Sequence, residues 1–282
     1  MRFAVVYSLR DPVGVGVARV LSGLMGGVEA SCAGSVVSCV RLSTGEFLAG
    51  YSVDQLFFEF LDSSPDPGAD AVIVLSKHSS SSGRPSLTVH YTGNPTGDAS
   101  LGGSPGVLSV AAALLGRELL RAYRDSARDL GLLGEYQLSF EATHHGPTGN
   151  RKPLVFVEVG SGPEQWADGR AHTAMARAVA RVLEGKELLE TAECRVAAGF
   201  GGTHYPYKFT RLALEEGVCM GHMIPKYAFN RGVPRSVIFQ ALEKNWPAPA
   251  ATAVIEKKSI RSAHRRLVEE VAAEAGVRVE YV

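Results

Sequence analysis

The chain has 282 residues, 45% of them hydrophobic, and its 29 basic residues balance its 29 acidic residues, so the formal net charge is zero. This length and composition predict a globular protein with a sizeable core, built as one large domain or two small ones. A zero net charge excludes a protein that is basic over its whole surface, so any nucleic-acid-binding surface has to be a local patch.

The cysteines and the apolar runs indicate in which cellular compartment the protein is expected. None of the four cysteines stands in a Cys-x-x-Cys pair, which predicts reduced, buried thiols in a cytoplasmic protein and argues against a cysteine-based zinc knuckle. No apolar run approaches the roughly 20 residues that span a bilayer. We therefore expect a cytoplasmic protein that does not enter a membrane.

The N-terminal part alternates predicted strands with a helix. A strand is predicted over Arg2–Leu9, and Asp11-Pro12 has the N-cap residue and first-turn proline of a helix that runs to about residue 25. A second strand is expected over Val36–Leu42. Ala71–Ser76 is a continuous apolar run, typical of a buried parallel strand.

The strand over 71–76 ends in Lys77-His78. A lysine beside a histidine could hold a phosphate group or stabilise an oxyanion. The alternative is a pair that faces a loop and has no role.

A long helix is predicted over Val107–Leu130, after a loop at Thr92–Gly106 that is rich in Gly, Pro, Asn and Ser. Arg117, Arg121 and Arg124 recur at helical spacing and therefore share one face. This face is either a solvated surface, since acidic residues stand nearby, or a contact for RNA phosphates.

Two adjacent histidines follow the alternating run Glu135–Ala142, which is predicted to be a half-buried strand. Glu141, His144 and His145 could supply a general base or the ligands of a metal ion. Adjacent residues of a strand point to opposite faces, so one of the two imidazoles could be structural, whereas in a turn both could face one site.

Glu158 is a charge inside the apolar run Pro153–Val159, which is predicted to be another strand. A buried carboxylate needs a partner, which a histidine or a metal ion would provide. Strand alternation could equally place Glu158 on an exposed face. His172 lies on the apolar face of the next helix and is predicted to be a core histidine, with Asp168 as its candidate partner.

The segment Gly201–Lys208 is a glycine-rich turn that opens a helix. Backbone N–H groups at helix N-termini bind anions, so Gly201, Gly202, Thr203 and Lys208 are candidates for substrate binding and His204 for catalysis. The segment matches neither the dinucleotide-binding fingerprint nor the P-loop, so we expect no nucleotide cofactor.

Two further segments stand near the C-terminus. Gly221–Pro225 is interpreted as a turn that carries His222, after a short strand over Val218–Met220. Lys257 and Lys258 belong to a basic cluster that either contacts RNA backbone or forms a solvated end.

Strands and helices alternate along the whole chain, which predicts an α/β fold with a mixed or mostly parallel sheet sandwiched by helices. No linker or charge block divides the sequence. We expect one domain over residues 1–282, with two interleaved lobes as the alternative.

Five histidines share one local setting, because each follows a predicted strand or stands in a Gly/Pro-rich turn. They are His78, His144, His145, His204 and His222. Since the strand ends at one edge of an α/β sheet converge in space, these side chains are predicted to gather in one cleft.

Six motifs occur in an order that resembles a known family. They are Ser76-Lys-His78, His90-Tyr-Thr-Gly-Asn-Pro95, Glu141-Ala-Thr-His-His-Gly-Pro-Thr148, Glu158-Val-Gly-Ser161 with Glu164-Gln-Trp166, Gly201-Gly-Thr-His-Tyr-Pro206, and Gly221-His-Met-Ile-Pro225. Over nearly its whole length, the chain resembles the archaeal and plant type of D-aminoacyl-tRNA deacylase. In place of a Lys-Lys-Gly turn, the chain has Lys257-Lys-Ser259.

The resemblance implies a fold akin to the phosphorylase and peptidyl-tRNA hydrolase group. It implies hydrolysis of the ester between a D-amino acid and the 3′ end of tRNA, a form of chiral proofreading. It also implies zinc as a cofactor, with a role left open. The ligand candidates are His144, His145, His204, His222 and Glu158.

The expected partner is tRNA charged with a D-amino acid, and the expected state is a monomer. A water activated by histidine or zinc would attack the ester carbonyl. Lys77, Lys208 or the N–H groups of the Gly201 turn would hold the oxyanion, and the segment His90–Pro95 would line a cleft for the terminal adenosine. The alternatives are a zinc-dependent peptidase or amidase, and a non-catalytic RNA-binding module.

Overall fold

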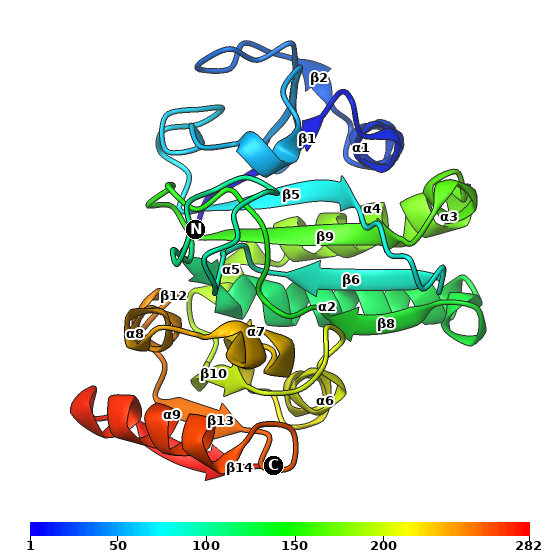
Figure 1. Ribbon diagram of the computed structural model, residues 1–282. Helices are drawn as coiled ribbons and strands as arrows, with labels where there is room; N and C mark the ends of the chain where they lie inside the picture. Colours follow the sequence, from blue (N-terminus) through cyan, green and yellow to red (C-terminus); the bar gives the residue numbers. More distant parts are fainter. The chain divides into compact units, whose positions relative to one another are not determined.

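The chain divides into two units whose segments alternate along the sequence, and the computed structural model describes all residues from 1 to 282 (Figure 1). Unit 1 contains residues 1–89, 118–139 and 154–192, and unit 2 contains residues 90–117, 140–153 and 193–282. Both units combine a sheet with helices. The α/β class with a mostly parallel sheet flanked by helices is therefore confirmed, while the single domain stays a prediction.

In the sheet of unit 1, the first strand of the chain, β1, lies between β4 and β5. The strand order of this sheet is β2-β3-β4-β1-β5-β9-β6-β8. The bounds are β1 Phe3–Ser8, β2 Val28–Glu29, β3 Ser38–Arg41, β4 Phe47–Tyr51, β5 Ala71–Lys77, β6 Ser86–His90, β8 Gln137–Phe140 and β9 Leu154–Gly160. β1 is parallel to β4 and β5, and β5 is parallel to β9, whereas β3 is antiparallel to β4. All six residues of β1 and all seven of β9 are buried, as continuous apolar runs in parallel sheets should be.

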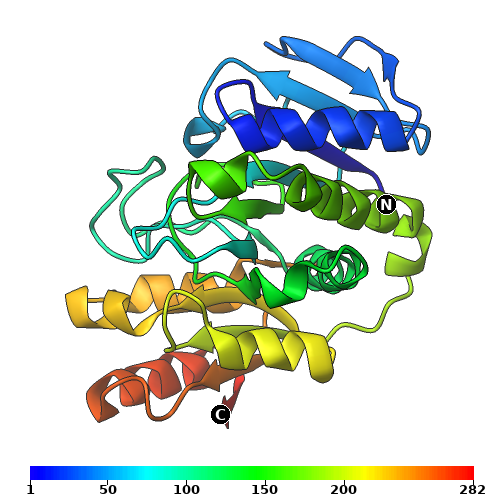
Figure 2. The same ribbon diagram turned by 90° about the vertical axis from the view of Figure 1, so that its right-hand side faces the viewer.

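Helices α1 (Pro12–Leu24) and α4 (Gly169–Glu184) run side by side against this sheet (Figure 2). Asp11 caps α1 by accepting hydrogen bonds from the backbone N–H groups of Val13 and Gly14, as the Asp-Pro signal predicted. His172 of α4 lies against Gly16 of α1, where any larger side chain would meet the imidazole ring.

His172 therefore packs between the two helices, but it is half-buried rather than part of the core that was predicted. Its partner, however, is the carbonyl of Trp166, 2.9 Å from Nε2, rather than the side chain of Asp168. Asp168 instead caps α4 through the backbone N–H of Arg170.

The remaining helices of unit 1 are short, apart from α2. They are η1 Gln55–Phe57, α2 Ala113–Asp129, η2 Leu132–Gly134, α3 Pro163–Trp166 and α5 Lys186–Leu189. Most of α2 belongs to unit 1, and Tyr123 anchors it to β9 by donating its hydroxyl to the carbonyl of Glu158 at 3.2 Å. The helix begins six residues later than the sequence indicated, because Ala111–Ala112 forms strand β7.

Unit 2 is built on a four-stranded parallel sheet with the order β11-β10-β13-β14. Its elements are β7 Ala111–Ala112, β10 Val196–Phe200, α6 Tyr207–Glu215, β11 Cys219–Ile224, α7 Lys226–Arg231, α8 Arg235–Glu243, β12 Asn245–Trp246, β13 Thr252–Ile255, α9 Ser262–Glu274 and β14 Arg278–Tyr281. Strands β7 and β12 pair in parallel. The carboxyl ends of β10, β11 and β13 meet at one edge, where ligands collect in parallel sheets.

The cysteine prediction is wrong, because all four cysteines are paired. Cys32 bonds to Cys39, and Cys194 bonds to Cys219, with Cα atoms 5.9 and 5.8 Å apart. Sequence separations of 7 and 25 residues carry no Cys-x-x-Cys signal, so each bond depends on how the chain folds back. None of the helices is both long and apolar enough to span a bilayer.

Candidate functional site

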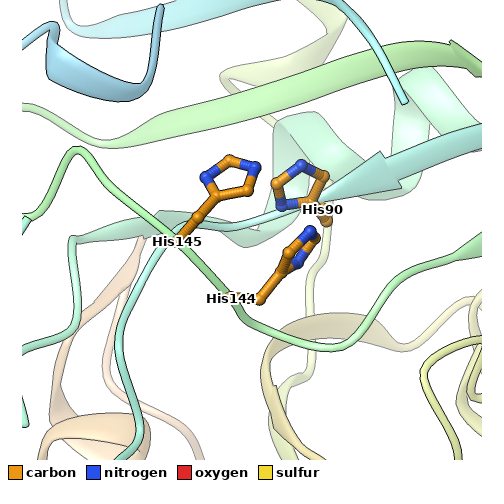
Figure 3. Close-up of side chains that lie close together, drawn as sticks. All are labelled: His90, His144 and His145. Carbon is orange, nitrogen blue, oxygen red and sulfur yellow. The ribbon is translucent and has the colours of Figure 1, made fainter. Parts of the chain in front are cut away.

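Three imidazoles gather in unit 2, at the last residue of β6 and in the segment after β8 (Figure 3). The ring centroids are 4.4 Å apart for His90 and His144, 4.8 Å for His90 and His145, and 4.3 Å for His144 and His145. One ligand nitrogen from each lies within 4.8 Å of the others. We call these residues the imidazole cluster.

The backbone explains why two adjacent histidines face the same side. His144 bridges to Thr92, and the N–H of Gly93 donates to the carbonyls of His144 and His145. His145 then takes a left-handed conformation with φ of 47°. This conformation is uncommon for residues other than glycine and breaks the strand alternation that would separate the two rings.

Backbone carbonyls fix the tautomers of two of the rings. Nδ1 of His144 lies 2.8 Å from the carbonyl of Ala142, and Nδ1 of His145 lies 2.6 Å from the carbonyl of Gly146. A carbonyl only accepts, so both Nδ1 atoms carry a proton, and in a neutral ring the lone pair then lies on Nε2. Burial, then the neighbouring His145 and His90, lower the pKa of His144 well below 6.5, so its ring is neutral at pH 7.

A buried carboxylate links the cluster to a fourth imidazole. Glu141 has 0% exposure, and its Oε2 accepts a hydrogen bond from Nε2 of His204 at 2.9 Å. The same oxygen lies 3.6 Å from Nε2 of His144. The hydroxyl of Tyr227 lies 3.4 Å from Nδ1 of His204, and burial raises the pKa of this phenol to about 12. His204 is therefore held between a carboxylate and a neutral phenol.

A cavity of about 160 Å³ opens beside His144 and His145. Its walls are the segment 94–101, the segment 143–145 and the α7 residues Tyr227, Ala228 and Arg231. Both apolar and polar residues line the cavity, for example Leu101 and Asp98. The site therefore combines several imidazoles, a buried carboxylate and a hollow for part of a ligand.

His222 was predicted in a turn, but it lies inside β11 with 0% exposure. Both ring nitrogens are engaged, because Nδ1 lies 3.1 Å from the hydroxyl of Thr143 and Nε2 lies 3.0 Å from the carbonyl of Ser109. His222 is therefore a buried structural residue, and we leave it out of the candidate ligands.

Burial lowers the pKa of His222 from 6.5 to about 4. As the pH falls from 6.5 towards 4, the unfolded chain takes up a proton that the native state does not. The free energy of unfolding should therefore drop, by about 3 kcal/mol below pH 4. We expect His222→Gln to be less stable than the wild type at pH 7.5 but to lose less stability between pH 7.5 and 4. Urea unfolding at both pH values checks this, and an equal loss in both proteins would contradict it.

Two of the N–H groups that the sequence offered for anion binding in the segment 201–208 already have partners. The N–H of Gly201 donates to the carbonyl of Ile224 at 2.8 Å, and the N–H of Gly202 donates to the hydroxyl of Ser259 at 2.6 Å. Lys208 lies 3.9 Å from Glu256, and the hydroxyl of Thr203 donates to the carbonyl of Tyr205. These two glycine N–H groups are occupied, so we do not assign the oxyanion to them.

Lys77, His78 and Glu158 lie together in unit 1. Nδ1 of His78 is 3.5 Å from Oε2 of Glu158, and both side chains are buried. The ammonium of Lys77 lies 5.0 Å from the ring centre of Trp166, whose indole N–H donates to the carbonyl of His78. Glu158 thus has the histidine partner that a buried carboxylate needs, while the predicted roles of all three residues stay predictions.

The arginine stripe on α2 is divided. Arg117 is 6% exposed and donates to the carbonyls of Glu193 and Gly217, so it is not available to RNA, contrary to the prediction. Arg121 lies 3.7 Å from Glu118, and Arg124 lies 3.6 Å from Asp125. Lys257 and Lys258 are both exposed.

The sequence missed two parts of this site. The sequence predicts His90 only as part of the wall of an adenosine cleft. Tyr227 gave no signal, since a tyrosine in a short helix is usually a packing residue. Its role depends on the approach of α7 to His204, which is a long-range contact.

The comparisons with known proteins agree with one another. The family model described as D-aminoacyl-tRNA deacylase matches residues 66–280. The chain is 49% identical to the D-aminoacyl-tRNA deacylase of Aeropyrum pernix over 100% of both chains, and 37% identical to that of Staphylothermus marinus over 99% of both. It also matches a crystal structure described as a conserved protein of unknown function, with 28% identity, a TM-score of 0.88 and coverage of 99% of this chain and 95% of the other.

Proposed function

Since this chain belongs to the D-aminoacyl-tRNA deacylase family, we propose that it hydrolyses the ester between a D-amino acid and the 3′ end of tRNA at the imidazole cluster of unit 2. The products are free tRNA and the D-amino acid. The observation that carries the assignment to this cluster is the group of three imidazoles beside a cavity, joined through Glu141 to His204.

His204 is the candidate general base. Its Nε2–H donates to the carboxylate of Glu141, so in the neutral ring Nδ1 holds the lone pair. The hydroxyl of Tyr227 lies 3.4 Å from this Nδ1. A water beside that hydroxyl would give it a proton as it attacks the ester carbonyl, while the hydroxyl passes its own proton to Nδ1, and Glu141 would stabilise the imidazolium that forms. An aminoacyl ester is already reactive towards water, so a single positioned base can supply much of the rate enhancement that the reaction needs.

The imidazole cluster also fits a metal ion. Catalytic zinc sites commonly have three protein ligands, and zinc-bound histidines commonly donate their other N–H to a carbonyl or carboxylate. His144 and His145 each donate Nδ1–H to a carbonyl, which leaves Nε2 for the metal. We propose that His90, His144 and His145 would hold zinc, which when bound would activate water and polarise the ester carbonyl.

The cavity beside His144 and His145 would receive the group next to the scissile ester. An enzyme can select a D-amino acid by leaving no room for the side chain of the L-form, without any attraction to the D-form. The segment 94–101 and α7 form walls of this cavity. They are therefore the candidates for chiral selection.

Product analysis tests the proposed function. We expect the purified protein to convert D-tyrosyl-tRNA into free D-tyrosine and intact tRNA that can be charged again. No release of D-tyrosine would contradict the proposal, and activity on peptides without activity on D-tyrosyl-tRNA would identify a peptidase instead.

A further inference from the structure

The edge of the four-stranded sheet beside His204 is strongly basic, although the whole chain has zero net charge. Three segments follow the carboxyl ends of β10, β11 and β13, namely residues 201–208, 224–231 and 256–266. They contain one acidic residue, Glu256, and eight basic residues: Lys208, Lys226, Arg231, Lys257, Lys258, Arg261, Arg265 and Arg266. Such a local excess is the signature of a surface for a polyanion.

Hydrogen bonds join the three segments into one surface. The N–H of Gly202 donates to the hydroxyl of Ser259 at 2.6 Å, which ties the turn after β10 to the loop after β13. The N–H of Lys226 donates to the carbonyl of Gly202 at 3.0 Å, which ties the start of α7 to the same turn. The three basic segments are therefore joined at the turn that carries His204.

Hydrogen bonds from a side chain of helix α9 order the loop after β13. The guanidinium of Arg265 donates to the carbonyls of Lys257 and Ile260 at 3.0 and 2.8 Å. Arg265 thus orders the loop, while Lys257, Lys258 and Arg261 remain exposed. The single carboxylate, Glu256, lies 3.9 Å from the ammonium of Lys208. The negative charge of Glu256 therefore offsets the positive charge of Lys208.

The surface is continuous with the cavity at the imidazole cluster. Helix α7 begins at Lys226, beside the turn, and Tyr227 and Arg231 of the same helix line the cavity. A ligand that places an ester in the cavity would therefore extend over a basic surface.

From this arrangement, and resting on the proposed function, we propose that Lys226, Lys257, Lys258 and Arg261 bind the phosphodiester backbone at the acceptor end of tRNA. We call these four residues the phosphate surface. It contributes binding energy that does not depend on the amino acid, so its loss weakens substrate binding without slowing the bond-breaking step. Chiral selection remains with the cavity.

The test compares Lys257→Ala/Lys258→Ala with the wild type on two substrates. On D-tyrosyl-tRNA we expect KM to rise about tenfold at low salt while kcat stays the same. The plot of log KM against log salt should become shallower by about 1.5, because each phosphate contact contributes roughly 0.7 to 0.9 to the slope. On D-tyrosyl-adenosine, which has no phosphate, both proteins should have the same kcat/KM.

The matched control is Arg195→Ala/Arg278→Ala, which removes the same charge at the amino ends of β10 and β14, where both arginines pair with Glu280. The proposal is overturned if the lysine variant leaves KM and the salt slope unchanged, or if the arginine variant changes them equally. It is also overturned if the lysine variant loses activity on D-tyrosyl-adenosine. If the wild type hydrolyses neither substrate, the proposed function itself fails.

Discussion

Replacing Glu141 by alanine is expected to lower the single-turnover rate of D-tyrosyl-tRNA hydrolysis by about 10² to 10⁴, the range that a positioned general base supplies. The carboxylate is completely buried and holds Nε2 of His204 at 2.9 Å. Without it, the ring of His204 loses both its orientation and the negative charge that stabilises the imidazolium. The measurement is rapid quench with enzyme in excess over substrate.

Glu141→Gln separates orientation from charge. The amide oxygen can still accept from His204, so this variant should keep the ring in place and lose only the electrostatic part, giving a rate between those of alanine and the wild type. Thermal unfolding of both variants shows whether they are folded. A folded Glu141→Ala protein with the wild-type rate would contradict the proposed role of Glu141 in holding His204.

Removing one imidazole ligand from the imidazole cluster is expected to weaken metal binding strongly. His144→Ala and His145→Ala should each weaken zinc binding at least about a hundredfold, more than the 10- to 100-fold loss typical of mutating residues behind the ligands. Deacylation should fall with metal content. Elemental analysis after dialysis and calorimetric titration with zinc measure the two quantities.

A histidine outside the cluster provides the control. His264 of α9 stacks on Phe229 with ring centroids 5.4 Å apart. Its replacement by alanine should leave zinc content and deacylation unchanged. If His144→Ala and His145→Ala keep their zinc but lose activity, the imidazoles act on protons or substrate rather than on a metal.

The parts of the site that a local pattern defines could be predicted from the sequence. The alternating run before His144 and the break at Gly146-Pro147 place the two histidines at a strand end, where the structure has them. The apolar runs of β1, β5 and β9 and the Asp11 cap depend on neighbouring residues alone. These elements therefore matched the expectation to within a few residues.

The parts that failed depend on contacts far along the chain. Gly221 and Pro225 indicated a turn, but β11 continues through Gly221 because its missing side chain makes room for Asn245. Helical periodicity predicts that Arg117 and Arg121 share one face. It could not show that the carbonyls of residues 193 and 217 would accept from Arg117.

The Gly201–Gly202 turn shows the same limit. Its sequence is typical of an anion-binding helix start, and the motif is local. The hydroxyl that occupies the N–H of Gly202 comes from Ser259, 57 residues later. A local motif identifies donors but not their partners, so the occupant of such a turn requires a structure.

The central claim is that the site cleaves a D-aminoacyl ester and rejects the L-form. The most direct test is the ratio of kcat/KM for D-tyrosyl-tRNA and L-tyrosyl-tRNA, measured side by side with the same tRNA and the same enzyme preparation. We expect release from the D-ester to be faster by at least about a hundredfold, which corresponds to roughly 3 kcal/mol of discrimination between the two transition states. Equal rates on both esters, or no release from the D-ester, would contradict the account.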